Sequence, residues 1–308
     1  RRGTRHGQRR ARRLLLPHHW PAWTALGVVW LAARLPYALL LRLGAALGGL
    51  AGGFLRTRRR VARRNLALCF PALDSASREQ LLRENLRDSG RMLAEFALAW
   101  MGSDRALARV PQTIEGLEHL ESARRAGRGV LLVGAHFAHL ELCARLVSRR
   151  IPIAGMYRTM DSPVFDWAVL RARLRYAAAM FTKEELRATV KYLKAGGIVW
   201  YAPDQDMRGK DSVFAPFFGV PAATITATHH LARLSGAVVL PFFHRRLPQG
   251  GYALRLGAPL ADFPGSDAAA DTARVNAQIE AMVREAPAQY LWLHKRFKTR
   301  PPGAAPVY

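Results

Sequence analysis

The stretch that decides the fold is GVLLVGAHFAHLE, residues 129–141 of a 308-residue chain. It opens with a short apolar run between two glycines, which is typical of a strand buried in a sheet. His136 follows this run, and Glu141 comes five residues after the histidine. In an α/β protein, ligands bind in the crevice outside the carboxyl ends of the strands. We therefore expect His136 to face a functional crevice.

The spacing of His136 and Glu141 predicts how the two side chains cooperate. Five residues on a helix turn through about 500°, so the side chains lie roughly 140° apart and cannot share one helical face. We expect His136 in the loop that leaves the strand and Glu141 one turn into the next helix, where its carboxylate holds the imidazole Nδ1–H. Nε2 is then free to take a proton from a substrate hydroxyl. This is the base and orienting carboxylate of a serine hydrolase triad, with the nucleophile supplied by the substrate.

Other interpretations of this stretch stay open. A histidine at a strand end is often structural, and the closeness of His136, His139 and Glu141 in the sequence suggests a metal site. The His-x-x-His spacing differs from the i, i+4 spacing of helical zinc proteases, and no third ligand cluster is evident, so we predict no bound metal. Cys143 is expected to be a packed thiol rather than a nucleophile.

Apolar runs and helical patterns alternate through the rest of the chain. Strands are predicted at 129–133, 151–156, 198–202, 238–243 and 252–256, and helices at 77–100, from 138, and at 162–175, 183–195, 224–235 and 271–285. Such alternation predicts an α/β fold with a mixed, mostly parallel sheet flanked by helices. The sequence contains no P-loop and no dinucleotide-binding glycine pattern.

Polar residues follow the second and third predicted strands at one edge of the sheet. Arg158 comes after the second strand, and Asp204 and Asp206 come after the third. A guanidinium at a strand end suits a phosphate or a developing negative charge, although an ordinary surface arginine has the same local sequence. The two aspartates either contact substrate at this rim or cap a turn, as Asp after Pro often does. We assign all three residues to substrate binding.

The first 64 residues differ in composition from the rest. Residues 1–13 hold seven arginines, residues 14–55 are almost wholly apolar, and residues 56–64 hold six more arginines. The stretch 14–33 is long enough to cross a bilayer core of about 30 Å. We therefore divide the chain into a basic, membrane-anchoring segment, 1–64, and an α/β domain, 65–308. A single span, a hairpin and an in-plane helix pair all remain possible.

The formal net charge of +25 indicates an acidic partner. Nucleic acid, an anionic membrane and a phosphorylated substrate all fit, as does a solvated surface rich in arginine. Residues 212–221 are apolar and aromatic without helical or strand periodicity, and they form either an acyl-chain groove or a core loop. Residues 290–300 mix aromatics with cations, which suits anionic lipid headgroups or RNA, or else a solvated basic tail.

Taken together, these motifs resemble the lauroyl and myristoyl acyltransferases of lipid A biosynthesis, within the lysophospholipid acyltransferase-like group. The resemblance covers nearly the whole chain and rests on the His136-x4-Glu141 box and on Arg64-Asn65-Leu66, Cys69-Phe70-Pro71, Tyr157-Arg158 and residues 200–206, 214–218, 289–292 and 296–301. It implies a glycerolipid acyltransferase-like fold with His136 as general base and Glu141 as its orienting carboxylate. Arg158 resembles the second-block arginine, and Asp204 a substrate-contacting or structural residue. His139 departs from the family, whose members often carry a small or hydroxyl residue there.

The resemblance also implies an activity and a place in the cell. The implied enzyme is an O-acyltransferase of Gram-negative bacteria, held by its N-terminal anchor at the cytoplasmic face of the inner membrane. It moves a lauroyl-type chain (C12–C14) from acyl carrier protein to a hydroxyl of a Kdo-bearing lipid A precursor of the lipid IVA type, a late step of lipopolysaccharide biosynthesis. The expected partners are acyl carrier protein, the anionic precursor and membrane lipids, with no nucleic acid and no cofactor besides the acyl donor.

Two alternatives to this activity remain. One is an acyltransferase that acts on another glycolipid or on a phospholipid. The other is a membrane-tethered basic scaffold without enzymatic activity, in which His136 would be incidental.

Overall fold

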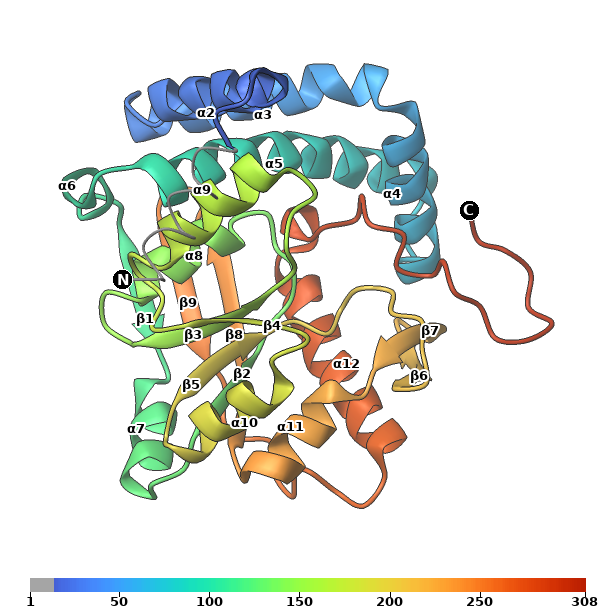
Figure 1. Cartoon of the computed structure of the whole chain (residues 1–308). Helices are drawn as coiled ribbons and strands as arrows, with labels where there is room; N and C mark the ends of the chain where they lie inside the picture. Colours follow the sequence, from blue (N-terminus) through green and yellow to red (C-terminus); the bar gives the residue numbers. More distant parts are fainter. Residues whose placement is uncertain (1–13) are drawn as a thin grey trace.

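A seven-stranded sheet forms the centre of the computed structural model, which describes residues 14–308 (Figure 1). The arginine-rich run 1–13 lies outside the described residues. The strands are β1 Gln112–Glu115, β2 Val130–Val133, β3 Ile153–Tyr157, β4 Met180–Thr182, β5 Ile198–Tyr201, β8 Val238–Arg246 and β9 Tyr252–Leu256, in the order β1-β9-β8-β2-β5-β3-β4. Every neighbouring pair is parallel except β8 and β9. The predicted α/β fold with a mixed, mostly parallel sheet is therefore confirmed.

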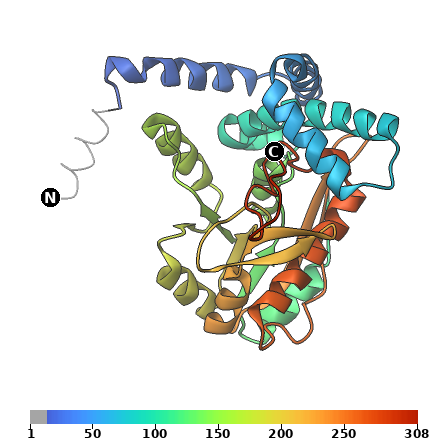
Figure 2. The same ribbon diagram turned by 90° about the vertical axis from the view of Figure 1, so that its right-hand side faces the viewer.

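Helices cover both faces of this sheet (Figures 1 and 2). They are α4 Arg56–Cys69, α5 Ser75–Met101, α6 Asp104–Leu107, α7 Leu117–Arg125, α8 Leu140–Val147, α9 Pro163–Arg173, α10 Leu186–Lys194, α11 Ala227–Ser235 and α12 Ala268–Glu285, with a short 3₁₀ turn η2 Pro287–Gln289. Leu131 and Val133 of β2 pack into one core with α10, α11 and α12, and Val130 and Leu132 pack into a second core with α7, α8 and α9. Successive residues of a strand point to opposite faces, so a strand covered on both faces is apolar throughout.

A separate antiparallel hairpin, β6 Ser212–Phe217 and β7 Val220–Ile225, lies beside α12 (Figure 1). The prediction that residues 212–221 lack strand structure is therefore wrong. Pro216 and Pro221 face each other across the hairpin, and proline within an apolar run argues against a central strand, although a two-stranded ribbon tolerates it. The turn residues Phe218 and Gly219 both have positive φ, 51° and 74°, as a tight hairpin turn requires.

The N-terminal helices lie across the top of the domain in Figure 1. They are a 3₁₀ turn η1 Pro17–His19, α2 Trp20–Ala32 and α3 Tyr37–Phe54. The predicted crossing stretch 14–33 is not one helix, because α2 has only 13 residues, about 20 Å of helix against a bilayer core of about 30 Å. Among the described helices, the 18-residue α3, with a mean hydropathy of 1.4, is long and apolar enough to cross a membrane. The boundary predicted after residue 64 falls inside α4.

Glycines let α3 and α5 approach each other closely. A Cβ on Gly48 would lie 2.2 Å from the carbonyl oxygen of Leu86, and a Cβ on Gly90 would lie 2.0 Å from that of Gly44. The opposite side of α3 exposes the large apolar side chains of Leu39, Leu43, Leu47, Leu50 and Phe54. These residues recur every three or four positions and so share one helical face. One side of α3 is thus fitted to α5, and the other presents an uncovered apolar stripe.

Candidate active site

His136 and Asp204 form the centre of the site. Strands β2 and β5 pair in parallel with Val133 opposite Tyr201, and His136 and Asp204 each follow these paired residues by three positions. The two loops therefore leave the sheet side by side. His136 Nδ1 lies 2.6 Å from Asp204 Oδ1, and the backbone N–H of His136 donates to Oδ2 at 2.9 Å. Asp204 thus holds both the imidazole and the loop that carries it.

The contact with Asp204 also decides the charge of the pair. Burial alone would raise the pKa of Asp204, but His136 outweighs burial and lowers this pKa to about 2. Burial alone would lower the pKa of His136, but the carboxylate outweighs it and raises this pKa above its ordinary value of 6.5. Because a carboxylate only accepts hydrogen bonds, the neutral imidazole keeps its hydrogen on Nδ1 and its lone pair on Nε2. This arrangement is that of a general base.

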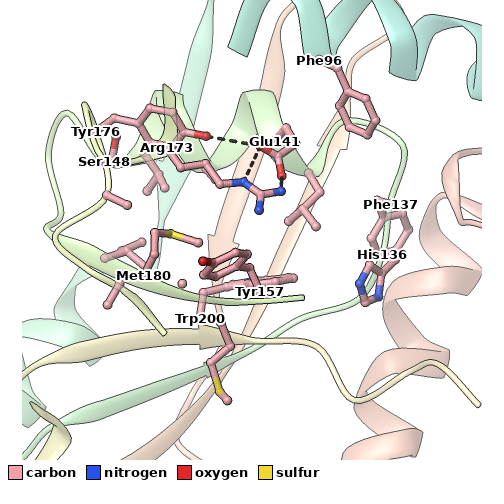
Figure 3. A pocket seen from close by; sticks show the side chains of 18 of the residues that line it. Phe96, His136, Phe137, Glu141, Ser148, Tyr157, Arg173, Tyr176, Met180 and Trp200 are labelled. Carbon is pink, nitrogen blue, oxygen red and sulfur yellow. Dashed lines mark hydrogen bonds and ion pairs between the residues drawn. The ribbon is translucent and has the colours of Figure 1, made fainter. Parts of the chain in front are cut away.

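Glu141 does not hold His136 in this structure. Its carboxylate accepts a hydrogen bond from Trp100 Nε1 at 2.9 Å and two from the guanidinium of Arg173. Figure 3 shows Glu141 turned toward Arg173, with the imidazole of His136 on another side of the cavity. The orienting contact predicted from the spacing is therefore wrong, and Asp204 makes it instead. The reason is topological, since strand pairing places the loop after β5, and not the first turn of α8, beside Nδ1.

Arg173 is the site residue that the sequence did not reveal. It is the last residue of α9, and Nε donates to Glu141 Oε2 at 3.2 Å while Nη2 donates to Oε1. Nη1 makes no hydrogen bond to a described residue, and Figure 3 shows a guanidinium nitrogen pointing away from Glu141 into the cavity. The available signal was weak, because Arg171 and Arg173 in the last turn of a helix fit the ordinary preference of cations for that end.

An apolar cavity of about 310 Å³ opens beside His136. One part of it is lined by Tyr157 and Arg158, where β3 ends. Another part is lined by Ile153, where β3 begins, and by Ser148, which follows the end of α8. Figure 3 shows Ser148 and His136 on opposite sides. The cavity therefore extends from the carboxyl edge of the sheet along the space between β3 and α8. A mostly apolar cavity with a few polar groups at one end suits a fatty acyl chain.

The three residues assigned to substrate binding lie in different places. Arg158 is exposed and lines the cavity at the end of β3, so its role as an anion-binding residue stays a prediction. Asp204 is only 2% exposed and sits behind His136, outside the cavity lining. Asp206 also lies outside that lining, and its carboxylate accepts hydrogen bonds from the backbone N–H and the hydroxyl of Thr299 at 2.9 and 3.0 Å. The two aspartates therefore hold other parts of the protein rather than facing the cavity.

The C-terminal segment supports the histidine loop. Residues 290–300 are not a solvated tail, because Tyr290 is buried and the N–H of Leu291 donates to the carbonyl of His136 at 3.0 Å. The hairpin residues 212–221 do not line the cavity. That stretch therefore does not form the cavity suited to an acyl chain, which lies between β3 and α8.

The metal-ligand group considered from the sequence does not assemble. His136 faces Asp204, Glu141 faces Arg173, and His139 turns into the core. Cys143 is fully buried, does not line the cavity, and burial raises the pKa of its thiol well above the usual range. The prediction of a packed thiol is confirmed.

This geometry defines a class of site. Within residues 14–308, the imidazole of His136 has a carboxylate on Nδ1 and no serine or cysteine hydrogen-bonded to Nε2. A base without a protein nucleophile, beside an apolar cavity, is suited to acyl transfer onto a hydroxyl that the substrate supplies.

Comparisons with known proteins identify the family. The family described as bacterial lipid A biosynthesis acyltransferase matches residues 8–299. The chain is 43% identical over 297 residues to the lipid A biosynthesis lauroyltransferase of Escherichia coli (strain K12), with 96% of this chain and 97% of the relative covered. It is 41% identical over 300 residues to the lipid A biosynthesis palmitoleoyltransferase of the same organism (97% of each chain) and 29% identical over 302 residues to its lipid A biosynthesis myristoyltransferase (95% and 91%). The chain belongs to the bacterial lipid A biosynthesis acyltransferase family and is an acyltransferase.

Proposed function

We propose that this chain transfers a lauroyl-type chain (C12–C14) from acyl carrier protein to a hydroxyl of a Kdo-bearing lipid A precursor of the lipid IVA type. The observation that carries the proposal is the His136–Asp204 pair beside the apolar cavity. It supplies a base where the polar end of a bound acyl chain would meet the acceptor. The relatives named lauroyltransferase and palmitoleoyltransferase support a fatty acyl donor.

The reaction proceeds in two steps. Nε2 of His136 takes the proton of the acceptor hydroxyl as its oxygen attacks the thioester carbonyl, which forms a tetrahedral intermediate. The carbon–sulfur bond then breaks, the ester forms, and the thiolate of the carrier takes the proton from the imidazolium. Asp204 stabilises the imidazolium between the two steps because its carboxylate stays ionised.

Arg173 supplies the charge that the intermediate needs. Its free Nη1 lies in the cavity wall, and a guanidinium suits an oxyanion in a site sheltered from water. Glu141 acts through Arg173, since two hydrogen bonds fix the plane of the guanidinium. Both residues of the sequence-predicted dyad thus belong to the site, although they do not touch each other.

The exposed apolar surface of the N-terminal helices supports a location at a membrane. The apolar stripe on α3, together with the exposed Trp20 and Trp30 of α2, gives a surface that water solvates poorly and that a lipid interface accepts. The net charge of +25 favours anionic lipid, a phosphorylated acceptor and an acidic carrier protein. We place the enzyme at the cytoplasmic face of the bacterial inner membrane, where acyl carrier protein is available.

The test is transfer of a labelled acyl chain from acyl carrier protein by the full chain purified in detergent. The acceptors are a Kdo-bearing tetraacylated precursor, the same precursor without the sugar, and a lysophospholipid. We expect the Kdo-bearing precursor to be preferred, and His136→Ala to lower the rate by about 100- to 10,000-fold.

Two results would change the assignment. Transfer to the lysophospholipid alone would move the enzyme to another lipid acceptor. Undiminished transfer by a folded His136→Ala protein would exclude His136 as the base.

A further inference from the structure

A second polar cluster lies in the core beneath the loop that carries His136. It consists of His139, the N-cap residue of α8, Cys143 one turn further along α8, and His244 on β8. All three side chains are fully buried. One ligand atom from each, a ring nitrogen of each histidine and Sγ, all lie within 4.8 Å of one another. The proposed acyl transfer uses none of the three residues.

The hydrogen bonding of His139 leaves a lone pair free on its ring. Its Nε2 lies 3.0 Å from the carbonyl oxygen of His244. A carbonyl only accepts, so the hydrogen of the neutral ring is on Nε2 and the lone pair is on Nδ1. Nδ1 is buried and has no hydrogen-bond partner among the described residues. A backbone carbonyl on one ring nitrogen is the usual second contact of a histidine whose other nitrogen binds a metal.

His244 is also left without partners. Neither of its ring nitrogens makes a hydrogen bond to a described residue, although the ring is buried among Phe137, Phe242 and His139. Buried polar side chains nearly always have a partner, so each exception calls for an explanation. Two imidazoles with free nitrogens and one thiol, brought together from α8 and β8, are the ligand types of a soft metal ion.

We propose that His139 Nδ1, a ring nitrogen of His244 and Cys143 Sγ bind one thiophilic d10 cation, Zn²⁺ or Cu⁺. Binding releases the thiol proton to solvent, and the resulting thiolate balances one positive charge. The nearby guanidinium of Arg246 is already paired with acidic side chains of α5. A monovalent cation would leave the cluster neutral, which favours Cu⁺ in a site without water contact.

The cation would stabilise the loop that carries His136. It would tie the first turn of α8, three residues after His136, to β8 in the centre of the sheet. Ligand atoms around a zinc ion lie about 3.4 to 4.0 Å apart, given bonds of about 2.0 to 2.3 Å. Binding therefore draws the three atoms, which lie within 4.8 Å of one another, together by up to about 1.4 Å. Because all three ligands are buried, we expect the cation to be acquired during folding.

The test measures metal in the full chain after expression with a defined supply. Untagged protein is produced in minimal medium with added Zn²⁺, Cu²⁺ or Co²⁺, or with none, purified in detergent, and analysed for bound metal by mass spectrometry. The variant is Cys143→Ala. Its matched control is Cys69→Ala, which removes the other buried thiol.

We expect one equivalent of zinc or copper in the wild type and in Cys69→Ala, and loss of the stoichiometric metal in Cys143→Ala, which lacks one of the three ligands. The metal-loaded wild type should unfold at a higher temperature than the metal-free wild type. Cobalt-grown wild type should show a thiolate-to-cobalt charge-transfer band, a readout that needs no variant and therefore stands even where Cys143→Ala fails to fold.

Folded wild type without stoichiometric metal under any supply, and without the cobalt band, would overturn the proposal. Metal retained equally by Cys143→Ala would overturn the assignment of its ligands. Neither result bears on acyl transfer by His136.

Discussion

Replacing Asp204 by asparagine tests which carboxylate orients His136. The asparagine keeps the shape but carries no charge, and its amide donates to Nδ1, which moves the ring hydrogen to Nε2 and blocks the base. The same change in a Ser-His-Asp triad lowers kcat by about 10⁴-fold, and we expect a loss of about 10³- to 10⁴-fold here. The labelled transfer assay measures kcat, and Glu141→Gln is compared in parallel; it should lower kcat through Arg173 but leave the pH profile set by His136 unchanged.

The stability cost follows from the pKa of Asp204. Its fall from 3.8 to about 2 corresponds to roughly 2 kcal/mol of folding free energy, at about 1.4 kcal/mol per unit. Because the folded-state pKa is lowered, this stabilisation is present above pH 3.8 and is lost as the pH falls toward 2. A neutral asparagine lacks it, so denaturant unfolding at about pH 5, where His136 is still charged, should show Asp204→Asn destabilised by about 2 kcal/mol.

The pH dependence of the rate gives an independent readout of the same contact. The base works only when neutral, so wild-type kcat/KM should rise with pH through the pKa of His136, which Asp204 holds above 6.5. Without the carboxylate, burial is unopposed and lowers that pKa. The residual activity of Asp204→Asn should therefore rise at a lower pH than that of the wild type.

One pattern of results would refute this reasoning. If Asp204→Asn kept kcat within about threefold of the wild type and the same pH profile, while Glu141→Gln lost both, Glu141 would be the orienting carboxylate after all. The hydrogen-bond geometry described above would then not be that of the working enzyme.

Three further predictions follow from the same geometry. Arg173→Lys keeps the charge but not the two-point contact with Glu141, so kcat should fall by roughly 10- to 1,000-fold with KM for the acyl donor little changed, measured by initial rates. Ser148→Phe should shorten the cavity by about two methylenes, each worth about 0.8 kcal/mol. For two acyl donors that differ by two methylenes, kcat/KM for the longer should therefore fall about 15-fold relative to the shorter. Gly48→Ala should destabilise the fold by about 1 to 3 kcal/mol in thermal unfolding, because its Cβ meets backbone 2.2 Å away, whereas Gly53→Ala, with nothing within 4 Å, should not. Equal effects of the two glycine changes would contradict close packing of α3 on α5.

Local patterns were enough to predict the framework of the site. The unbroken apolar run 130–133 predicted a strand covered on both faces. The histidine after this strand indicated that the site lies at the carboxyl edge of the sheet. Arg158 was likewise correctly placed at that edge and lines the cavity. These features depend on residues within a few positions of each other, so they are readable from the chain alone.

The partners within the site depend on contacts between distant parts of the chain. Asp204 reaches His136 across 68 residues because β5 pairs with β2. Each residue follows its strand by three positions, and this equal spacing predicts a contact only once the pairing of the two strands is known. Arg173 reaches Glu141 because α8 and α9 both pack on α5, which no local spacing encodes. The strands of the 212–221 hairpin were missed because this stretch shows no alternation of apolar and polar residues, whereas β6 and β7 form by pairing with each other.

The sequence by itself determined the central strands and the longer helices of the α/β domain, and it placed the histidine at the end of a buried strand. The tertiary structure alone decided which carboxylate holds His136, which arginine faces the cavity, and how His139, Cys143 and His244 come together. The physical reason is the distance along the chain over which each interaction acts. Backbone propensity and burial act over a strand or a helical turn, whereas hydrogen bonds and ion pairs form between whichever side chains the pairing of strands brings within about 3 Å.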